Sequence, residues 1–281
     1  MDDSSCMMDD FSSVSSDDPT IAKILSEASD AESSGKRDDA VSLYRKASDL
    51  GCTDAAVHLA MMLVDGTEEE RKEAIGLFRL ADGKGNSAGT RNLGYCYAVG
   101  IGVEKDKEKA AELYIKAAEM GNAKAMCNIG VLYEYGHGVP QDDAKAAEWF
   151  GRSAEGGYSR GMTNYACMLR DGKGIAKDPK AAEDWFWKSG SPRAKRLLAI
   201  MKLEGTDIPK DAECARYLLE DASATDSKAM VILGDMIVGE DRERAVALYT
   251  KAASKWNNDA KERLEKLGEP LPDSAPRKKK N

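Results

Sequence analysis

The side chains that most often build catalytic and metal sites are scarce in this sequence. Its 281 residues include two histidines, His58 and His137, and six cysteines without a CxxC pair. Neither histidine has a cysteine or a carboxylate at metal-ligand spacing, so we expect no metal site. A Cys–His nucleophile pair would require His58 to lie near Cys52 or Cys96, and nothing nearby would supply an oxyanion site. We therefore expect no catalytic residue and no metal ion.

Two glycine turns raise the separate question of phosphate or nucleotide binding. They are residues 136–138 (GHG) and 172–174 (GKG). Neither belongs to a GxxxxGK[ST] sequence or to a strand–GxGxxG–helix context, which are the arrangements that cradle phosphate groups. Turns of this kind recur along the chain, which indicates helix ends. We therefore expect no cofactor and interpret these glycines as connections between helices.

The turns recur because the sequence repeats itself about every 36 residues. Residues 86–97, 122–133 and 158–169 resemble one another, and each stretch is followed by a glycine turn and an alanine-rich block. Self-similarity at this period predicts a stacked array of helix pairs. The chain should therefore consist of first and second helices in alternation.

Positions within the repeat have predicted packing roles. The first helix carries an apolar residue followed by a small one, as in Leu93–Gly94 and Ile129–Gly130. A glycine in mid-helix costs about 1 kcal/mol relative to alanine, which is tolerable where a partner helix crosses closely. We expect the alanines of the second helix to make this contact, and the aromatic residue behind them to fill space against the next repeat.

Helix ends are also predicted. Asp106, Asp142 and Asp178 stand where the second helices need an N-cap, and Pro179 suits a first helical turn. The glycines that follow the first helices are expected to adopt positive φ. These are Gly66, Gly100, Gly136, Gly172, Gly205 and Gly239.

Two stretches resemble the Sel1-like repeat (SLR) family, namely residues 93–103 (LGYCYAVGIGV) and 129–139 (IGVLYEYGHGV). Each is followed by an aspartate, a Lys-Ala pair and an aromatic pair. This family is related to the tetratricopeptide repeats. The likeness covers residues 38–267, about six and a half repeats, and gives the first repeat only its second helix. The resemblance implies an all-α, right-handed superhelical solenoid whose first helices line a concave face. It also implies scaffold or adaptor duty rather than catalysis.

Charge and composition divide the chain into three parts. We expect two disordered tails. Residues 1–18 are acidic and rich in serine, and residues 269–281 contain three prolines and a basic run. Residues 19–268 between them are expected to form the solenoid. The formal net charge is −8 and the repeat body remains acidic, which argues against nucleic-acid binding. No run of apolar residues is long enough to span a membrane, and no signal peptide is evident. We therefore expect a cytoplasmic protein, or a nuclear one.

Asn92, Asn128 and Asn164 occupy the same position of three successive first helices. On a concave face they would form a ladder of amides, whose donors and acceptors suit an extended peptide backbone. Alternatively, they cap or bridge neighbouring helices. The basic residues beside them favour an acidic peptide or a carboxylate. The candidate binding residues are Arg91, Asn92, Tyr95, Lys124, Asn128, Val131, Arg160, Thr163, Asn164 and Arg170.

A second candidate surface involves the two tryptophans that flank Phe186. Only one of Trp185 and Trp187 can face the core, and we expect Trp187 to face outward, as a partner anchor or in contact with the next repeat. The leading functional hypothesis is a non-enzymatic adaptor that binds a peptide or a partner protein. The alternatives are a structural subunit of a large multiprotein assembly and a regulatory subunit of an enzyme.

Overall fold

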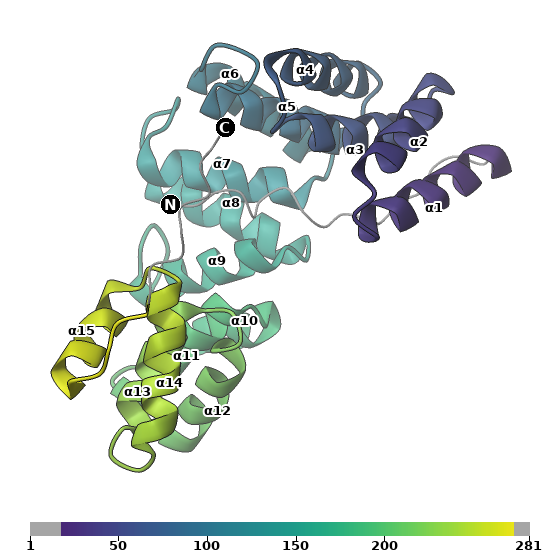
Figure 1. Cartoon of the computed structure of the whole chain (residues 1–281). Coiled ribbons are helices and arrows are strands. Elements are labelled where there is room, and N and C mark those ends of the chain that lie inside the picture. Colours follow the sequence, from purple (N-terminus) through teal and green to yellow (C-terminus); the bar gives the residue numbers. More distant parts are fainter. Residues whose placement is uncertain (1–17, 273–281) are drawn as a thin grey trace. The chain divides into compact units, whose positions relative to one another are not determined.

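The computed structural model describes residues 18–272, of which fifteen helices form the greater part (Figure 1). No strand is assigned within this range, and the predicted all-α fold is confirmed. The chain divides into two compact units, the first ending at Gly156 and the second beginning at Gly157. The two tails predicted to be disordered lie outside the described residues, apart from Asp18 and residues 269–272.

The first unit contains four helix pairs. They are α1 (Pro19–Ser33) with α2 (Arg37–Asp49), α3 (Thr53–Leu63) with α4 (Glu68–Gly83), α5 (Ser87–Val99) with α6 (Lys107–Glu119), and α7 (Ala123–Tyr135) with α8 (Asp143–Glu155). The first repeat thus has a first helix after all. Because α1 buries Ile21, Ile24 and Ala28, it is a full member of the stack.

The second unit continues the same pattern. Its pairs are α9 (Ser159–Asp171) with α10 (Pro179–Ser189), α11 (Pro192–Glu204) with α12 (Ala212–Ala222), and α13 (Ser227–Ile237) with α14 (Arg242–Ser254). The last described helix, α15 (Asn258–Leu267), packs against α14. It buries Ala260 and Leu264.

The predicted N-caps are confirmed, and most of the predicted turn glycines are as well. Oδ1 of Asp106, Asp142 and Asp178 accepts a backbone N–H three residues on, at 2.8, 3.0 and 2.9 Å. The prediction is wrong for Gly66 and Gly239. There α3 and α13 end in right-handed backbone, because the connection to the next helix is short. Positive φ occurs at Gly100, Gly136, Gly172 and Gly205.

The glycines inside the first helices mark close helix crossings, as predicted. A Cβ added to Gly130 would lie 2.6 Å from the ring of Phe150, and one added to Gly94 would lie 3.0 Å from the ring of Tyr114. The group at the crossing is therefore the aromatic ring of the second helix and not one of its alanines. The sequence interpretation placed this ring wrongly: it packs on the glycine of its own repeat.

Each second helix of the described residues, from α2 to α14, carries a large buried side chain. Burying such a side chain stabilises the fold by roughly 1.5–3 kcal/mol. In the pairs α5–α6, α7–α8 and α13–α14 the ring lies against a glycine of the first helix, which fixes the side of that helix that points away from the pair. These side chains are Tyr44, Phe78, Tyr114 and Phe150 in the first unit and Phe186, Leu218 and Tyr249 in the second.

Candidate partner-binding surface

The first helices form the tighter side of the stack within each unit. In the first unit α3 contacts α5, and in the second α11 contacts α13, whereas no two second helices contact each other to the same extent. Elements on the inner side of a curved stack lie closer together. Within each unit, therefore, the first helices line the concave side.

Three of the candidate residues project from one side of α5. Gly94 faces α6, since it lies against Tyr114. At 3.6 residues per turn, Tyr95 and Asn92 lie about 100° and 160° round the helix from Gly94, and Arg91 about 60°. Asn92 and Tyr95 therefore point away from α6, and Arg91 lies at the edge of the same side.

Asn92 has a buried donor that nothing satisfies. Its side chain is 1% exposed, and its Nδ2 group makes no hydrogen bond. A buried donor left without an acceptor costs about 1–3 kcal/mol. An oxygen from a ligand on this side of α5 would satisfy the donor and remove that cost.

The neighbouring first helix repeats the arrangement, with Lys124, Asn128 and Val131 in the corresponding region of α7. Lys124 is 8% exposed and Arg91 is 4% exposed, while Asn128 and Val131 are partly exposed. The only other charged side chain of α5 and α7 is Glu134, in the last turn of α7, so the N-terminal halves of both helices carry positive charge alone. We call the following six residues the α5–α7 face: Arg91, Asn92, Tyr95, Lys124, Asn128 and Val131.

In the second unit, the candidate residues Asn164 and Arg170 contact neighbouring side chains of the fold. Oδ1 of Asn164 accepts a hydrogen bond from Nη1 of Arg193 at 2.9 Å, which ties α9 to α11. Arg170 donates two hydrogen bonds to Asp171, at 2.7 and 2.8 Å, and this contact raises the pKa of its guanidinium. Arg160 is partly exposed. For Asn164 the geometry matches the bridging interpretation.

Thr163 belongs to a cluster of hydroxyl groups. Its Oγ1 lies 2.8 Å from Oγ of Ser189 and 3.2 Å from Oγ of Ser191, and it donates to the carbonyl oxygen of Ser159 at 3.0 Å. Ser191 also caps α11. The cluster joins α9 to the connection between α10 and α11, so the hydroxyl of Thr163 stabilises the packing of these helices.

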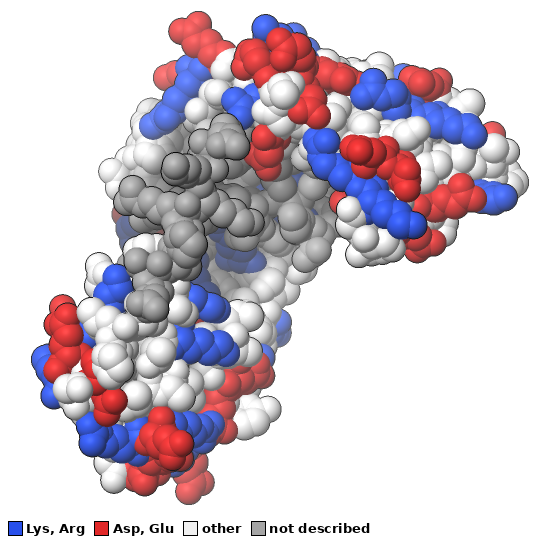
Figure 2. Space-filling model, viewed as in Figure 1, with Lys and Arg blue, Asp and Glu red and all other residues white. Residues whose placement is uncertain are grey.

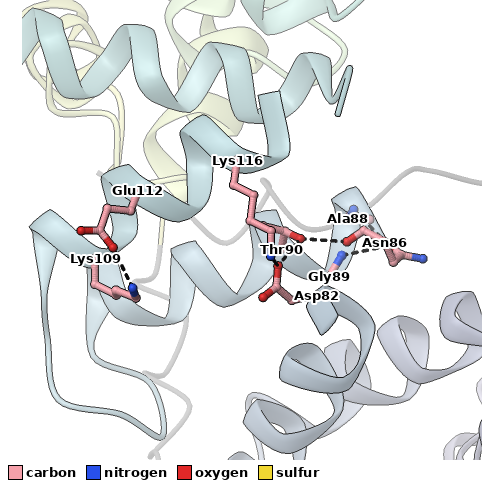
Figure 3. A network of polar contacts seen from close by, with 8 residues as sticks. All are labelled: Asp82, Asn86, Ala88, Gly89, Thr90, Lys109, Glu112 and Lys116. Carbon is pink, nitrogen blue, oxygen red and sulfur yellow. Dashed lines mark hydrogen bonds and ion pairs between the residues drawn. The ribbon is translucent and has the colours of Figure 1, made fainter. Parts of the chain in front are cut away.

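A polar network holds α5 in place against the second helices on either side of it, α4 and α6. Thr90 donates to Oδ1 of Asp82 at 2.7 Å, and Nζ of Lys116 contacts the same oxygen at 2.6 Å (Figure 3). Burial alone would raise the pKa of Asp82, but the hydrogen bonds from Lys116 and Thr90 outweigh burial and lower it. The network links α4, α5 and α6, and sequence reasoning did not find it.

A second periodic asparagine has the bridging role that was considered for Asn92. Oδ1 of Asn86 accepts two backbone N–H groups of the first turn of α5, at 3.1 and 3.0 Å, and its Nδ2 donates to Oδ1 of Asp54 in α3 at 2.7 Å. Asn122 caps α7 and reaches back to Ser87 at 3.3 Å. The period that singled out Asn92 also contains Asn86 and Asn122, so this signal was available in the sequence.

Trp187 faces outward, as predicted, and its side chain is 44% exposed. Trp185 lies edge-on to the ring of Tyr165, with 5.7 Å between ring centroids, and Nζ of Lys188 lies 4.3 Å from the centre of its ring. Trp187 thus adds an exposed aromatic side chain to the surface of the second unit.

His58 and Cys96, which were considered for a Cys–His nucleophile pair, lie in surroundings typical of residues that serve the packing of the fold. The imidazole of His58 stacks on Tyr44, with 5.2 Å between ring centroids, and burial lowers its pKa. Burial raises the pKa of Cys96 to about 12, so its thiol stays protonated at neutral pH and is a poor nucleophile. Within residues 18–272, no three His, Cys, Asp or Glu side chains are grouped so as to hold a metal ion.

Charged side chains of both signs are interspersed over each unit on the side that Figure 2 shows. Nucleic-acid-binding proteins instead tend to carry a continuous basic stripe. Among the helices between residues 18 and 272, none combines the length and the apolar composition needed to cross a membrane.

The sequence model of the Sel1 repeat family matches more than half of the chain. The matched segments are residues 36–52, 87–122, 123–158, 159–189, 192–224 and 230–255. The repeat made of α3 and α4, with its short connection, falls between the first two matches. No curated protein matches the chain.

Solved structures of similar fold agree with this match. A Sel1 repeat protein from Oxalobacter formigenes is 26% identical with a TM-score of 0.70, over 85% of this chain and 99% of that one. A protective antigen of uropathogenic Escherichia coli with an SLR fold is 29% identical with a TM-score of 0.65. That match covers 82% of this chain but 52% of the antigen, so the chain spans about half of the antigen's length. An immunity protein from Pseudomonas aeruginosa, 18% identical over 72% of this chain and 81% of its own, shares the fold with a TM-score of 0.51.

Proposed function

The chain belongs to the Sel1 repeat family, and from this we propose that it is a non-enzymatic adaptor whose α5–α7 face binds a partner protein. Repeats of this family generally mediate protein–protein interaction and are typically non-catalytic. The cysteines of the described residues are free thiols, in keeping with the reducing cytoplasm as its place of action.

The unsatisfied Nδ2 group of Asn92 is the observation that carries this proposal. The Nδ2 groups of Asn86 and Asn122 donate hydrogen bonds that hold helices together, so the amide donors at these two structural positions are satisfied. The Nδ2 group of Asn92 is buried on the concave side and makes none. A backbone carbonyl or a carboxylate of a bound segment is the acceptor that this geometry lacks.

The neighbours of Asn92 define the chemistry of the partner. Arg91 and Lys124 favour an acidic segment, because charge complementarity speeds encounter and disfavours basic partners. Tyr95 and Val131 are partly exposed and offer apolar contact between the charged positions. An extended segment with acidic residues beside apolar ones would use all of these groups.

The test is a comparison of the proteins retained by tagged full-length chains expressed in their native cells. Asn92→Ala and the double variant Arg91→Gln/Lys124→Gln should each lose the partners that the wild-type chain retains. The matched control is Leu80→Ala, because Leu80 lies on α4, a second helix, and is exposed. Retention of all partners by Asn92→Ala, with unchanged thermal unfolding, would contradict the proposal.

A structural subunit of a large assembly is the second candidate function. It is favoured by exposed aromatic side chains on second helices of the second unit, Trp187 at 44% and Tyr217 at 64% exposure. Exposed aromatic residues are enriched at interface hot spots. In that case Trp187→Ala and Tyr217→Ala, rather than Asn92→Ala, would release stoichiometric partners. If the retained partner is an enzyme, its activity with and without the chain tests a regulatory role.

A further inference from the structure

We propose that the aspartate-rich N-terminal segment, residues 1–17, is an intramolecular ligand of the α5–α7 face and competes there with partner proteins. The inference rests on the proposed function of that face. The segment contains no lysine, arginine or histidine, and apolar residues such as Met8 and Phe11 lie beside its acidic ones. Its aspartates are Asp2, Asp3, Asp9, Asp10 and Asp17.

The charge of the face is complementary to this segment. Arg91 and Lys124 are the charged residues in the N-terminal halves of α5 and α7, and both are more than nine-tenths buried. A charge in such low-dielectric surroundings interacts more strongly with an opposite charge than an exposed one does. The N-terminal ends of the two helices add partial positive charge in the same region.

Asn92 supplies a second, independent observation that points to a ligand. Its Nδ2 group is buried and has no acceptor, and it lies one residue from Arg91. An aspartate carboxylate has two acceptor oxygens and every residue of an extended segment has a backbone carbonyl. A segment that brings aspartates to Arg91 and Lys124 therefore also brings acceptors to Asn92.

The segment is long enough to reach the face. It ends at Asp17, beside the Asp18 cap that accepts the backbone N–H of Thr20 at 2.8 Å and starts α1. Seventeen extended residues span up to about 58 Å. From α1 the face lies two to three first helices along the same unit, or roughly 20–30 Å at usual helix spacings. Half of the segment therefore suffices to bridge this distance, and the rest is available for binding.

The basic segment near the C-terminus would not bind the α5–α7 face. Residues 277–280 (RKKK) are basic, so Arg91 and Lys124 would repel them. Docking of residues 1–17 would instead place the aspartates against the cations and cover Asn92. A partner protein would then need to displace the segment, which makes the adaptor self-limiting until an acidic ligand of higher affinity is present.

The experiment uses the full-length chain with the photo-cross-linking residue p-benzoylphenylalanine in place of Phe11. After irradiation of dilute protein, mass spectrometry should map intramolecular cross-links to α5 or α7. Replacing Asp2, Asp3, Asp9 and Asp10 by asparagine should lower their yield at least about fivefold, as should Arg91→Gln/Lys124→Gln. The matched control replaces the same four aspartates by glutamate, which keeps the charge and should keep the cross-links.

Cross-links that fall outside α5 and α7, that form between two chains, or that persist in the asparagine variant would overturn the inference. A second readout separates this result from the proposed function. If p-benzoylphenylalanine at position 11 cross-links to the face but Asn92→Ala loses no partner, the segment docks and the adaptor function fails. If Asn92→Ala loses partners but p-benzoylphenylalanine at position 11 forms no cross-link to the face, the adaptor function stands and the self-docking fails.

Discussion

The packing of Phe150 on Gly130 gives a quantitative prediction for the stack. Alanine at position 130 would place its Cβ 2.6 Å from the Phe150 ring, whereas ordinary contacts begin near 3.4 Å. The ring is 0% exposed, so it cannot swing into solvent and must move by about 0.8 Å within a packed core. Overpacking of this kind costs about 1–3 kcal/mol, against about 1 kcal/mol gained in helix propensity.

The matched control is Gly76, which lies inside α4 with nothing within 4 Å of its added Cβ. Gly76→Ala should stabilise the protein by about 1 kcal/mol through helix propensity alone. Gly130→Ala should instead lower the free energy of unfolding by up to about 2 kcal/mol. Gly94→Ala should fall between the two, because its added Cβ would lie 3.0 Å from the Tyr114 ring.

The assay is urea-induced unfolding followed by circular dichroism at 222 nm, with thermal melts in parallel. Each kcal/mol should shift the melting temperature by about 2–4 °C for a chain of this size. The reasoning is refuted if Gly130→Ala unfolds at the same urea concentration as Gly76→Ala or at a higher one. That outcome would mean that the ring does not limit the approach of α7 to α8.

Three further predictions concern the groups that hold α5. Asn86→Ala should lower the free energy of unfolding by about 1–2 kcal/mol, since it removes an N-cap and the bond to Asp54, and urea unfolding checks this. Asp82 has a pKa below its ordinary 3.8 in the folded chain, so its stabilising contribution is present above that value and disappears as the pH falls through the folded pKa. The stability gap between wild type and Asp82→Asn should therefore stay constant from pH 7 to about 5 and close at lower pH; a gap that widens on acidification would contradict it. The thiol of Cys96, with a pKa near 12, should react with a disulfide reagent such as DTNB only as the protein unfolds, which a Cys96→Ser control would assign.

The fold was largely predictable because its signals are local and periodic. Gly100 and Gly136 end helices with positive φ, and Asp106 and Asp142 begin them with a side-chain cap. Each feature depends on residues within one turn, so the sequence contains it directly. The close approach at Gly130 was predictable for the same reason, but the group that approaches was not. Choosing between an alanine and Phe150 depends on the rotation of α8 about its axis.

The candidate surface was predictable only as a set of helix positions. Asn92 and Asn164 occupy equivalent positions, yet Asn164 bonds Arg193 and the Nδ2 group of Asn92 bonds nothing. Arg193 of the neighbouring repeat donates to the Oδ1 atom of Asn164, whereas the unsatisfied group of Asn92 is itself a donor and needs an acceptor. Periodicity alone cannot show this, because it compares a residue with its equivalents and not with its contacts. Asn86 and Asn122 recur with the same period and so could have been noticed, but the period does not show which asparagine contacts the neighbouring helix.

The central claim is that a partner protein binds to the α5–α7 face. Photo-cross-linking in the native cells tests this claim most directly. Val99 extends the stripe of Asn92 and Tyr95 on α5 and is 47% exposed, and Leu80 on α4 is 46% exposed. The two positions therefore offer equal access, one on a first helix and one on a second helix. With p-benzoylphenylalanine at one position or the other, we expect position 99 to capture a recurring partner protein and position 80 to capture little of it. Equal or greater capture of that partner at position 80 would contradict binding at the face.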